Sequence, residues 1–528
     1  MTKSNREIGR WLDDNCLIVC IFISTAFLIF VQSYWLNTYI SPDSTHYLRA
    51  AQSLLNGHGL YVNTAAGDTA TYFSMWPIGY PAMIALVSLV TGAEVYLASK
   101  ILSVIFLAIL CTLFYFRFKK TAWVYALIVT NFGFLQIFWY TWSEQPFILG
   151  LVWISFAIMD IVASKRIQFR HYISLCLASL FLFFSRYIGT FSIGVIGLLA
   201  GYYLIAGISK AKKEYIKKSV LLIGAALIAA TVIIAYLYIN KTKGGYITGM
   251  ERIPTVEHPL RVFMLLCISS LMEIRNVFYS FFAMNYGLLI TLSVVGCFLL
   301  FRFRTKIKRY FSVQAVCFLS IGFLYWCSIV VMRFSAAFDG FDFRLLFPAS
   351  GLLFLGIVSL ILNYRSAWVK KINSTCIKYV LLICISASLF SYSLPEVYSV
   401  VKRFYKQEGG ITGFNKIHTG IIQELSFYKQ EVGINGYRKI RADIIQELSS
   451  VPEKSLVITN WGSKKSYLSF IRPDLFTTHS IWPLPIELHS KMEQVERVYI
   501  YFDWEQLPWD DAFFSPYRES NERVIQIK

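Results

Sequence analysis

Charged side chains are scarce in this sequence: they make up 15% of its 528 residues, whereas 56% are hydrophobic. Soluble globular domains carry about 25% charged residues. The mean hydropathy is +0.54, and apolar runs of the roughly 20 residues needed to cross a bilayer recur along the chain. The composition therefore excludes a soluble globular domain and predicts a polytopic membrane protein, mainly α-helical.

Disulfide and metal motifs are missing as well. All ten cysteines lie between Cys16 and Cys384, in or beside apolar runs, and neither the polar stretch around Asp43 nor the segment Glu396–Lys528 contains one. This excludes a disulfide framework, and thiols inside apolar spans behave as small apolar side chains. No CxxC or HExxH pattern occurs, and the seven histidines are scattered. We therefore expect no metal site and no bound cofactor, with a divalent metal ion left as an open alternative.

The formal net charge of +19 does not indicate a nucleic-acid partner. In membrane proteins the excess of Lys and Arg collects in short cytoplasmic loops. If the polar segment Met1–Asn15 is cytoplasmic, every loop assigned to that side carries two or more Lys or Arg close to an apolar run. A register shifted by one span would place all of them outside. We therefore predict a cytoplasmic N-terminus, an extracytoplasmic C-terminus and the lipid bilayer as a partner.

About eleven transmembrane helices are predicted in this register. The first, Cys16–Leu36, is too long for a cleaved signal peptide and has no small-residue cleavage site after it. The others are Val95–Phe116, Ala122–Tyr140, Phe147–Ala163, Tyr172–Phe184, Gly189–Ile208, Val220–Ile239, Phe281–Phe301, Phe311–Met332, Leu345–Leu362 and Tyr379–Ser393. The outer loops are 37–92, 240–280 and 333–344. Ile78–Val90 is apolar but short, which predicts an interfacial helix in the first outer loop.

The composition changes near residue 395, which divides the chain into a transmembrane domain, 1–394, and a polar C-terminal segment, 395–528. In that segment Ser455–Thr459 and Arg497–Phe502 are typical of buried strands, and Ile440–Leu448 of a helix. A small α/β extracytoplasmic domain is therefore predicted. No internal repeat is evident among the spans, which disfavours the inverted-repeat folds of transporters.

The stretch after the first span is the best candidate for a site. Asp43 opens a predicted short helix that places Tyr47 on the same face, and Asn56 and Gly57 end it. An aromatic corner, Trp76–Pro81, follows. An Asp at this position acts as a helix N-cap, or as a general base that accepts a proton from a hydroxyl. The two roles are compatible.

Glu144 offers a second carboxylate in the motif WSEQP, at the outer end of the third span. One interpretation is a helix-terminal anion, with Ser143 as the cap and Pro146 in the first turn. The other is a second catalytic acid. Two outer loops that each present a carboxylate at a helix start are more informative than either loop alone.

Arginines on the outer face are candidates for binding an anion. Arg186 lies in an outer turn and either snorkels at the interface or contacts a phosphate. Arg333 and Arg344 flank a loop that also holds Asp339 and Asp342. They either pair with these carboxylates or grip a phosphate through paired N–H donors.

Two motifs in the first outer loop resemble the corresponding loop of GT-C glycosyltransferases, the multi-span enzymes that use polyprenyl-phosphate sugars. This group includes protein O-mannosyltransferases and the lipid A aminoarabinose transferase. The motifs are Asp43-Ser44-x-x-Tyr47-x-x-Ala50-Ala51-x-x-Leu54-x-x-Gly57-x-Gly59 and Trp76-Pro77-x-Gly79-Tyr80-Pro81. Three further segments resemble bacterial members of this family: Trp142-Ser143-Glu144, Ser185-Arg186-Tyr187 and Arg344-Leu-Leu-Phe-Pro348. The family often has two adjacent acids in this loop, whereas this chain has Asp43-Ser44.

The resemblance implies a GT-C-like fold and the inverting transfer of a sugar from a polyprenyl-phosphate donor to a hydroxyl acceptor outside the membrane. Asp43 would match the catalytic base, and Glu144 the second acid, which positions the acceptor or the base. Arg344, Arg186 and Arg333 would contact the donor phosphate. Tyr47, His46, Trp76 and Tyr80 would line the substrate pocket. The acceptor would be a hydroxyl group of a glycan, lipid or protein. The resemblance to bacterial members also implies a location in the bacterial inner (plasma) membrane.

Three other functions remain as alternatives. A transporter or flippase of lipid-linked glycans would need ionisable residues near the middle of its spans, whereas the notable charges here lie at span ends. A polymerase or ligase of lipid-linked glycans would depend on Arg and His in a large outer loop. A receptor or scaffold would not need Asp43. Activity of an Asp43→Asn variant separates these hypotheses.

Overall fold

The structure is a computed structural model of the 528-residue chain. It describes residues 3–30, 41–63, 70–164, 166–249, 258–264, 266–267, 312–335, 343–368, 448–459, 476–479, 495–501 and 524–526. Within these ranges the chain is mainly α-helical, with two small sheets. The predicted spans Phe281–Phe301 and Tyr379–Ser393 lie outside the described residues.

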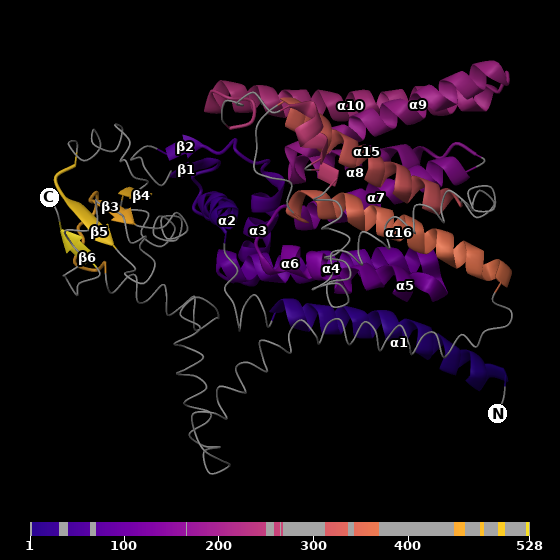
Figure 1. The fold of residues 1–528 in the computed structure, drawn as a ribbon, viewed down its shortest axis with the longest axis horizontal. Helices are drawn as coiled ribbons and strands as arrows, with labels where there is room; N and C mark the ends of the chain where they lie inside the picture. Colours follow the sequence, from indigo (N-terminus) through magenta and orange to yellow (C-terminus); the bar gives the residue numbers. More distant parts are fainter. Residues whose placement is uncertain are drawn as a thin grey trace, which may run out of the picture.

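Long apolar helices lie side by side and form the body of the molecule (Figure 1). Five stretches of the described chain are long and apolar enough to cross a membrane: Val95–Thr130, Glu144–Ala163, Tyr187–Ser209, Lys213–Gly244 and Val313–Phe334. Shorter apolar helices accompany them. The outer helix α10 (Lys213–Gly244) exposes large apolar side chains such as Leu227 and Ile234. The chain is therefore an integral multi-pass membrane protein, while the predicted total of eleven spans stays a prediction.

Most predicted spans coincide with a helix. The matching elements are α4 (Val95–Phe118), α7 (Glu144–Ala163), α8 (Phe169–Ser185), α9 (Phe191–Ser209), α10, α15 (Val313–Ser335) and α16 (Phe343–Trp368). Helix α1 (Lys3–Phe30) begins well before the apolar run, so the polar N-terminal segment extends the first span as a helix. The agreement follows from the length of the apolar runs, because backbone groups in lipid must be paired within a helix.

The span predicted over Ala122–Tyr140 is not one continuous helix, and its crossing of the membrane stays a prediction. After the short turn η2 (Lys119–Thr121), three consecutive segments replace it, namely α5 (Ala122–Ala126), η3 (Leu127–Thr130) and α6 (Phe132–Trp139). The break falls at Asn131, whose backbone is extended (φ −69°, ψ 142°) and whose Oδ1 accepts a hydrogen bond from the Gly133 N–H at 2.8 Å. Asn131 thus caps a new helix inside a hydrophobic run.

Helix α7 is the central helix and is buried along most of its length. It packs against α4, α8, α15 and α16. Aromatic side chains fill the core around it, including Phe156, Phe114 and Phe318. A residue at the start of α7 therefore lies inside the bundle rather than on its surface.

The first outer loop folds into two short helices and a hairpin at one end of the bundle (Figure 1). These elements are α2 (Pro42–Leu55), β1 (Tyr61–Asn63), β2 (Ala70–Tyr72) and α3 (Gly79–Thr91). Gly57 and Gly59 follow α2 with φ of 77° and 63°, a conformation that favours glycine and ends the helix. Helix α3 has 13 residues, too few to cross a bilayer. The predicted helix is confirmed, and its interfacial position stays a prediction.

The C-terminal segment contributes a four-stranded sheet of order β4-β3-β5-β6. Strand β3 (Leu456–Thr459) pairs in parallel with β4 (Phe476–His479) and β5 (Val498–Tyr501), and β6 (Val524–Gln526) is antiparallel to β5. The two strands predicted from the sequence are confirmed as β3 and β5. The predicted helix Ile440–Leu448 lies almost entirely outside the described residues, and the domain boundary stays a prediction.

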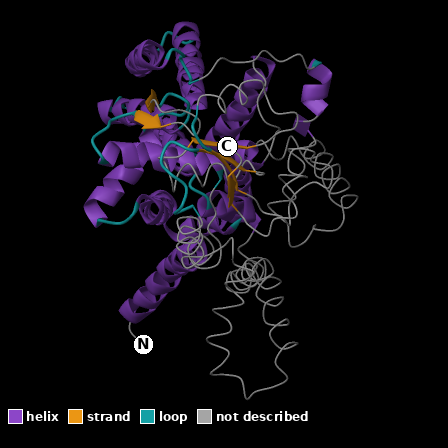
Figure 2. Ribbon diagram, turned by 90° about the vertical axis from the view of Figure 1, so that its left-hand side faces the viewer, coloured by secondary structure: helices purple, strands orange, loops and turns teal. Residues whose placement is uncertain are grey.

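This sheet lies beyond the end of the bundle that carries α2 and α3 (Figure 1). Figure 2 looks at that end, where loops and both sheets gather in front of the helices. Helix α1 begins at the end of the bundle opposite to the one that carries α2, α3 and this sheet (Figure 1). Which end faces the cytoplasm stays a prediction.

Candidate functional site

The site is built on the first turn of α2. Ser41 is the N-cap: its Oγ accepts a hydrogen bond from the Ser44 N–H at 3.2 Å. Pro42 occupies the first helical position, where a missing N–H has no cost. Asp43 follows inside the first turn, so the interpretation of Asp43 as the cap is wrong. Its carboxylate is directed at Arg344 instead.

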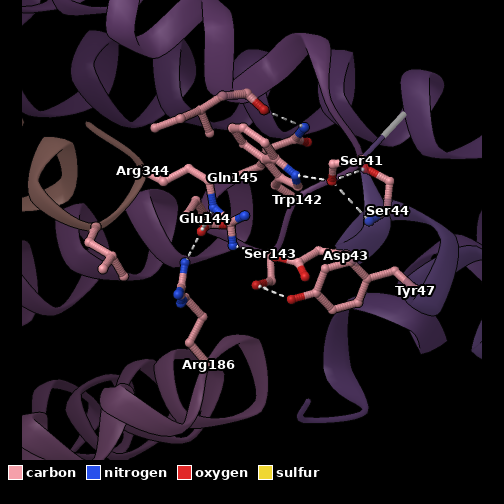
Figure 3. A network of polar contacts seen from close by, with 12 residues as sticks. Ser41, Asp43, Ser44, Tyr47, Trp142, Ser143, Glu144, Gln145, Arg186 and Arg344 are labelled. Carbon is pink, nitrogen blue, oxygen red and sulfur yellow. Dashed lines mark hydrogen bonds and ion pairs between the residues drawn. The ribbon is translucent and has the colours of Figure 1, made fainter. Parts of the chain in front are cut away.

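Arg344 joins two carboxylates that are far apart in the sequence (Figure 3). Its Nη2 donates to Asp43 Oδ2 at 2.5 Å, and its Nε donates to Glu144 Oε1 at 2.9 Å. Arg344 is the second residue of α16 and retains 19% side-chain exposure, and Asp43 retains 23%. The two residues predicted to supply acids are thus linked by one guanidinium. The alternative pairing of Arg344 with Asp339 or Asp342 involves residues outside the described ones.

Glu144 opens α7 and is completely buried. Its Oε1 forms ion pairs with both Arg344 and Arg186, whereas its Oε2 has no hydrogen-bond partner among the described residues. Ser143 does not cap the helix with its side chain, because its Oγ hydrogen-bonds the Tyr47 hydroxyl at 2.7 Å. Ser143 therefore occupies the predicted N-cap position without a side-chain capping bond, and Glu144, which is in the first turn as predicted, is the central anion of the cluster.

Arg186 approaches Glu144 from the end of α8. Its backbone is extended (φ −152°, ψ 141°), which ends the helix and turns the side chain inward. The side chain is 11% exposed, so the snorkelling interpretation is wrong. Burial disfavours the charged guanidinium, but the adjacent Glu144 carboxylate outweighs it and holds the pKa of Arg186 above its usual value. Arg186 is therefore a permanent cation.

Trp142 connects the cap of α2 to Arg344. Its Nε1–H donates to Ser41 Oγ at 2.6 Å, and the Arg344 guanidinium lies 4.5 Å from the centre of its ring. The Tyr140 ring stacks on the Trp142 ring, with the two ring centroids 4.1 Å apart. Such a cation–π contact stabilises a partly desolvated guanidinium. In the sequence Trp142 stands out only as part of a motif, and nothing marks Ser41.

Aromatic rings surround Tyr47, one helical turn after Asp43. Tyr80 makes an edge contact with a centroid distance of 5.3 Å, and Trp76 lies at 6.0 Å. Burial, with the nearby Glu144 and Asp43 carboxylates, raises the pKa of Tyr47 far above its usual 10. The phenol is therefore a neutral hydrogen-bonding group.

The aromatic corner packs tightly on the turn that carries Arg186. A Cβ on Gly79 would lie 2.5 Å from the carbonyl oxygen of Phe184, so only glycine permits this approach. The Tyr187 hydroxyl donates to the carbonyl oxygen of Ser74 at 2.6 Å. These contacts bring the first outer loop and the end of α8 to the same place.

A buried lysine supports the segment that leads to Glu144. Lys100 of α4 donates to the carbonyl oxygen of Trp139 at 2.6 Å and to Thr141 Oγ1 at 3.3 Å. One turn later along α4, Ser103 donates to Gln145 Oε1 at 2.8 Å. The turn between α6 and α7 is therefore held by polar contacts with α4.

The remaining predicted site residues are placed by their helices. His46 precedes Tyr47 in α2, and Arg333 lies in the last turn of α15. Among the described residues no group of three or more His, Cys, Asp or Glu side chains is arranged to hold a metal ion. The roles assigned to all these residues stay predictions.

Four charged side chains thus meet at one end of the helical bundle: Asp43, Glu144, Arg186 and Arg344. Their formal charges cancel, which makes a partly buried cluster tolerable. A carboxylate can accept a proton, and two guanidinium groups can bind an oxyanion. The cluster therefore contains both a group that can act as a general base and groups that can bind an anion.

Comparison with known proteins identifies the fold. No protein-family model and no curated protein matches the sequence. Among solved structures, ArnT from Cupriavidus metallidurans bound to undecaprenyl phosphate aligns with a TM-score of 0.50 at 10% identity, over 92% of both chains. Apo ArnT from the same organism gives 0.50 at 11% identity, again over 92% of both chains.

The Archaeoglobus fulgidus oligosaccharyltransferase gives a lower TM-score, 0.42, at 12% identity over 92% of this chain and 70% of the other. ArnT is a glycosyltransferase of the GT-C superfamily. The likeness to ArnT, at a low identity, establishes the fold: the chain has the fold of GT-C glycosyltransferases, as the loop motifs had suggested.

Proposed function

We propose that this protein is an inverting glycosyltransferase that moves a sugar from a polyprenyl-phosphate donor to a hydroxyl acceptor on the extracytoplasmic face of the membrane. The observation that carries the proposal is the bridge made by Arg344, which holds Asp43 and Glu144 together at the end of a GT-C fold. A solved structure of that fold, ArnT, has undecaprenyl phosphate bound.

Asp43 is the general base of the proposed reaction. It accepts the proton of the acceptor hydroxyl while that oxygen forms a bond to the anomeric carbon. The bond between the anomeric carbon and the phosphate oxygen breaks, and its electron pair leaves with the polyprenyl phosphate. Attack on the face opposite the leaving group inverts the anomeric centre. A positioned base contributes about 10²–10⁴-fold to such a step.

The leaving group is an anion whose charge grows as the bond breaks, so fixed cations stabilise the transition state. Arg344 and Arg186 are the cations of the cluster. A guanidinium has five N–H donors, and the two carboxylate bonds of Arg344 use two of them. Arg344 therefore has the capacity to contact a phosphate oxygen without releasing Asp43 or Glu144. Arg333 is a further candidate for the same anion.

The positions of these charges disfavour a transporter or flippase. Glu144 is the first residue of α7 and Arg344 the second of α16, whereas transport sites lie near the middle of broken spans. A polymerase or ligase of lipid-linked glycans shares the donor chemistry, and differs in its acceptor.

The test is the activity of Asp43→Asn in the purified full-length protein. Wild type and variant are incubated with a panel of polyprenyl-phosphate sugars and with lipid, glycan and peptide acceptors, and the released polyprenyl phosphate is measured. We expect the variant to lose about 10²–10⁴-fold in rate, because Asn cannot take the proton.

Asp160→Asn is the matched control. Asp160 lies near the other end of α7 and pairs with Arg117, away from the cluster. This variant makes the same chemical change, Asp to Asn, in a different helix and outside the cluster, and it should keep the wild-type rate. Full activity of Asp43→Asn would refute the assignment of the base.

A further inference from the structure

Three buried hydrogen-bonding atoms beside the charge cluster have no partner among the described residues. They are Glu144 Oε2, Tyr80 Oη and Trp76 Nε1. Glu144 and Tyr80 are completely buried side chains. A buried polar atom without a hydrogen bond destabilises the fold, so native proteins rarely keep one without a reason.

The three residues share one neighbour, Tyr47. The Tyr80 ring contacts the Tyr47 ring edge-on, and the Trp76 ring lies 6.0 Å from it. The Tyr47 hydroxyl is bonded to Ser143, which directly precedes Glu144. The unpaired atoms therefore belong to one group of residues around a single aromatic ring rather than to separate places in the bundle.

The hydrogen-bonding capacity of this group matches a sugar ring. A carboxylate oxygen accepts, a tyrosine hydroxyl donates or accepts, and an indole N–H donates. Adjacent hydroxyls of a sugar offer the same mixture, and its C–H faces pack on aromatic rings. A phosphate does not fit these three atoms, because the Glu144 carboxylate would repel it.

We propose that Glu144, Tyr80 and Trp76 bind the hydroxyl groups of the donor's sugar ring. This inference rests on the proposed function and names the subsite for one part of its substrate. The donor sugar is favoured over the acceptor because Glu144 Oε1 already holds Arg186 and Arg344. If these guanidinium groups hold the phosphate, the other oxygen of the same carboxylate lies next to the group attached to that phosphate.

The subsite has a signature that a purely structural role lacks. Tyr80→Phe removes a hydroxyl that has no partner in the part of the chain that the structure describes, so the variant should unfold at the same temperature as wild type or higher. The matched control is Tyr125→Phe. Tyr125 is also buried, but its hydroxyl is bonded to Ser359 Oγ at 3.0 Å, so its loss should lower the unfolding temperature.

The experiment measures the affinity of the purified full-length protein for undecaprenyl phosphate alone and for undecaprenyl-phosphate-linked glucose, mannose and aminoarabinose. We expect wild type to bind at least one sugar-linked form more tightly than the bare phosphate. Tyr80→Phe should lose about tenfold in affinity for that form, and Trp76→Phe should weaken it in the same way. Both variants, and the control, should bind the bare phosphate as wild type does.

Three results would overturn the subsite: equal affinity of wild type for sugar-linked and bare forms, unchanged affinity of Tyr80→Phe for the sugar-linked form, or an equal loss for both forms. Failure of the proposed function is distinguishable, since wild type would then bind neither form and transfer no sugar.

Discussion

The guanidinium Nη2 of Arg344 lies 2.5 Å from the Oδ2 of Asp43, although 301 positions separate the two residues. The same guanidinium binds Glu144, 200 positions away. One side chain at the start of α16 therefore fixes the relative position of two helix starts, those of α2 and α7, that each supply an acid. The proposed activity depends on this bridge, and most of its consequences are measurable.

Arg344→Lys keeps the charge but removes the bridge. A lysine ammonium is a point charge that lacks the planar fork of arginine, so it cannot hold both carboxylates in the same geometry. We expect the transfer rate to fall at least about tenfold, the equivalent of about 1.4 kcal/mol, while the protein still folds. Steady-state kinetics with the best donor of the panel measures the change.

The control for this change is Arg117→Lys, which alters the ion pair with Asp160 near the far end of α7. That pair is partly exposed, so its replacement should change neither rate nor stability by a measurable amount. Wild-type kinetics of Arg344→Lys would mean that the bridge has no role in the reaction.

Glu144→Gln should destabilise the protein strongly. It removes the carboxylate charge that Arg186 and Arg344 share in a buried position, and breaking a buried ion pair costs about 3–5 kcal/mol. Asp160→Asn changes a partly exposed pair on the same helix and should cost about 0–1 kcal/mol. Heat-induced unfolding of both variants in the same detergent gives the comparison. Equal midpoints would contradict the role of Glu144 as the anion that holds the cluster.

Trp142→Phe should uncouple the cap of α2 from Arg344. The variant loses the bond from Nε1–H to Ser41 Oγ but keeps an aromatic ring beside the guanidinium. We expect a loss of about 1 kcal/mol in stability and a several-fold lower rate. Ser41→Ala removes the same bond together with the cap.

The double variant of Trp142 and Ser41 is the decisive measurement. Residues that share one hydrogen bond are not additive, so the double variant should be less impaired than the sum of the single changes. Additive effects on the rate would mean that Trp142 acts on Arg344 alone.

Tyr47→Phe should change the response of stability to alkaline pH. Because the native pKa of Tyr47 lies far above its usual 10, the native state keeps the phenolic proton longer than the unfolded chain does. The associated stability is complete below about pH 10 and is lost as the pH rises above it. Unfolding temperatures measured between about pH 8 and 11 should therefore fall less steeply for Tyr47→Phe than for wild type. Parallel curves would contradict the buried, neutral phenol.

Local sequence signals predicted much of the fold. Apolar runs located α7, α8, α9, α10 and α15, because a helix that crosses the hydrocarbon core must be long and predominantly apolar. Strands β3 and β5 followed from short β-branched runs, whereas β4 and β6 were not predicted. The sequence of β4, FTTH, is mostly polar, and that of β6, VIQ, has only three residues. Pairing with a neighbouring strand defines both.

Capping was harder to predict than helix position. Both Ser41 and Asp43 are suitable caps by residue type, and the sequence pattern had favoured Asp43. The structure selects Ser41, whose Oγ also binds Trp142. Likewise Asn131 interrupts a hydrophobic run because its side chain caps α6. Such choices depend on contacts that no window of sequence contains.

The sequence by itself determined the class of protein and two carboxylates at helix starts, since hydropathy and helix signals act over a few residues. It also pointed to Arg186 and Arg344 as outer-face cations. Only the tertiary structure decided that these four side chains meet, that Arg344 serves both acids, and that one oxygen of Glu144 stays unpaired. Ion pairs across 200 or 301 positions follow from how the helices pack, and the local pattern carries no record of that packing.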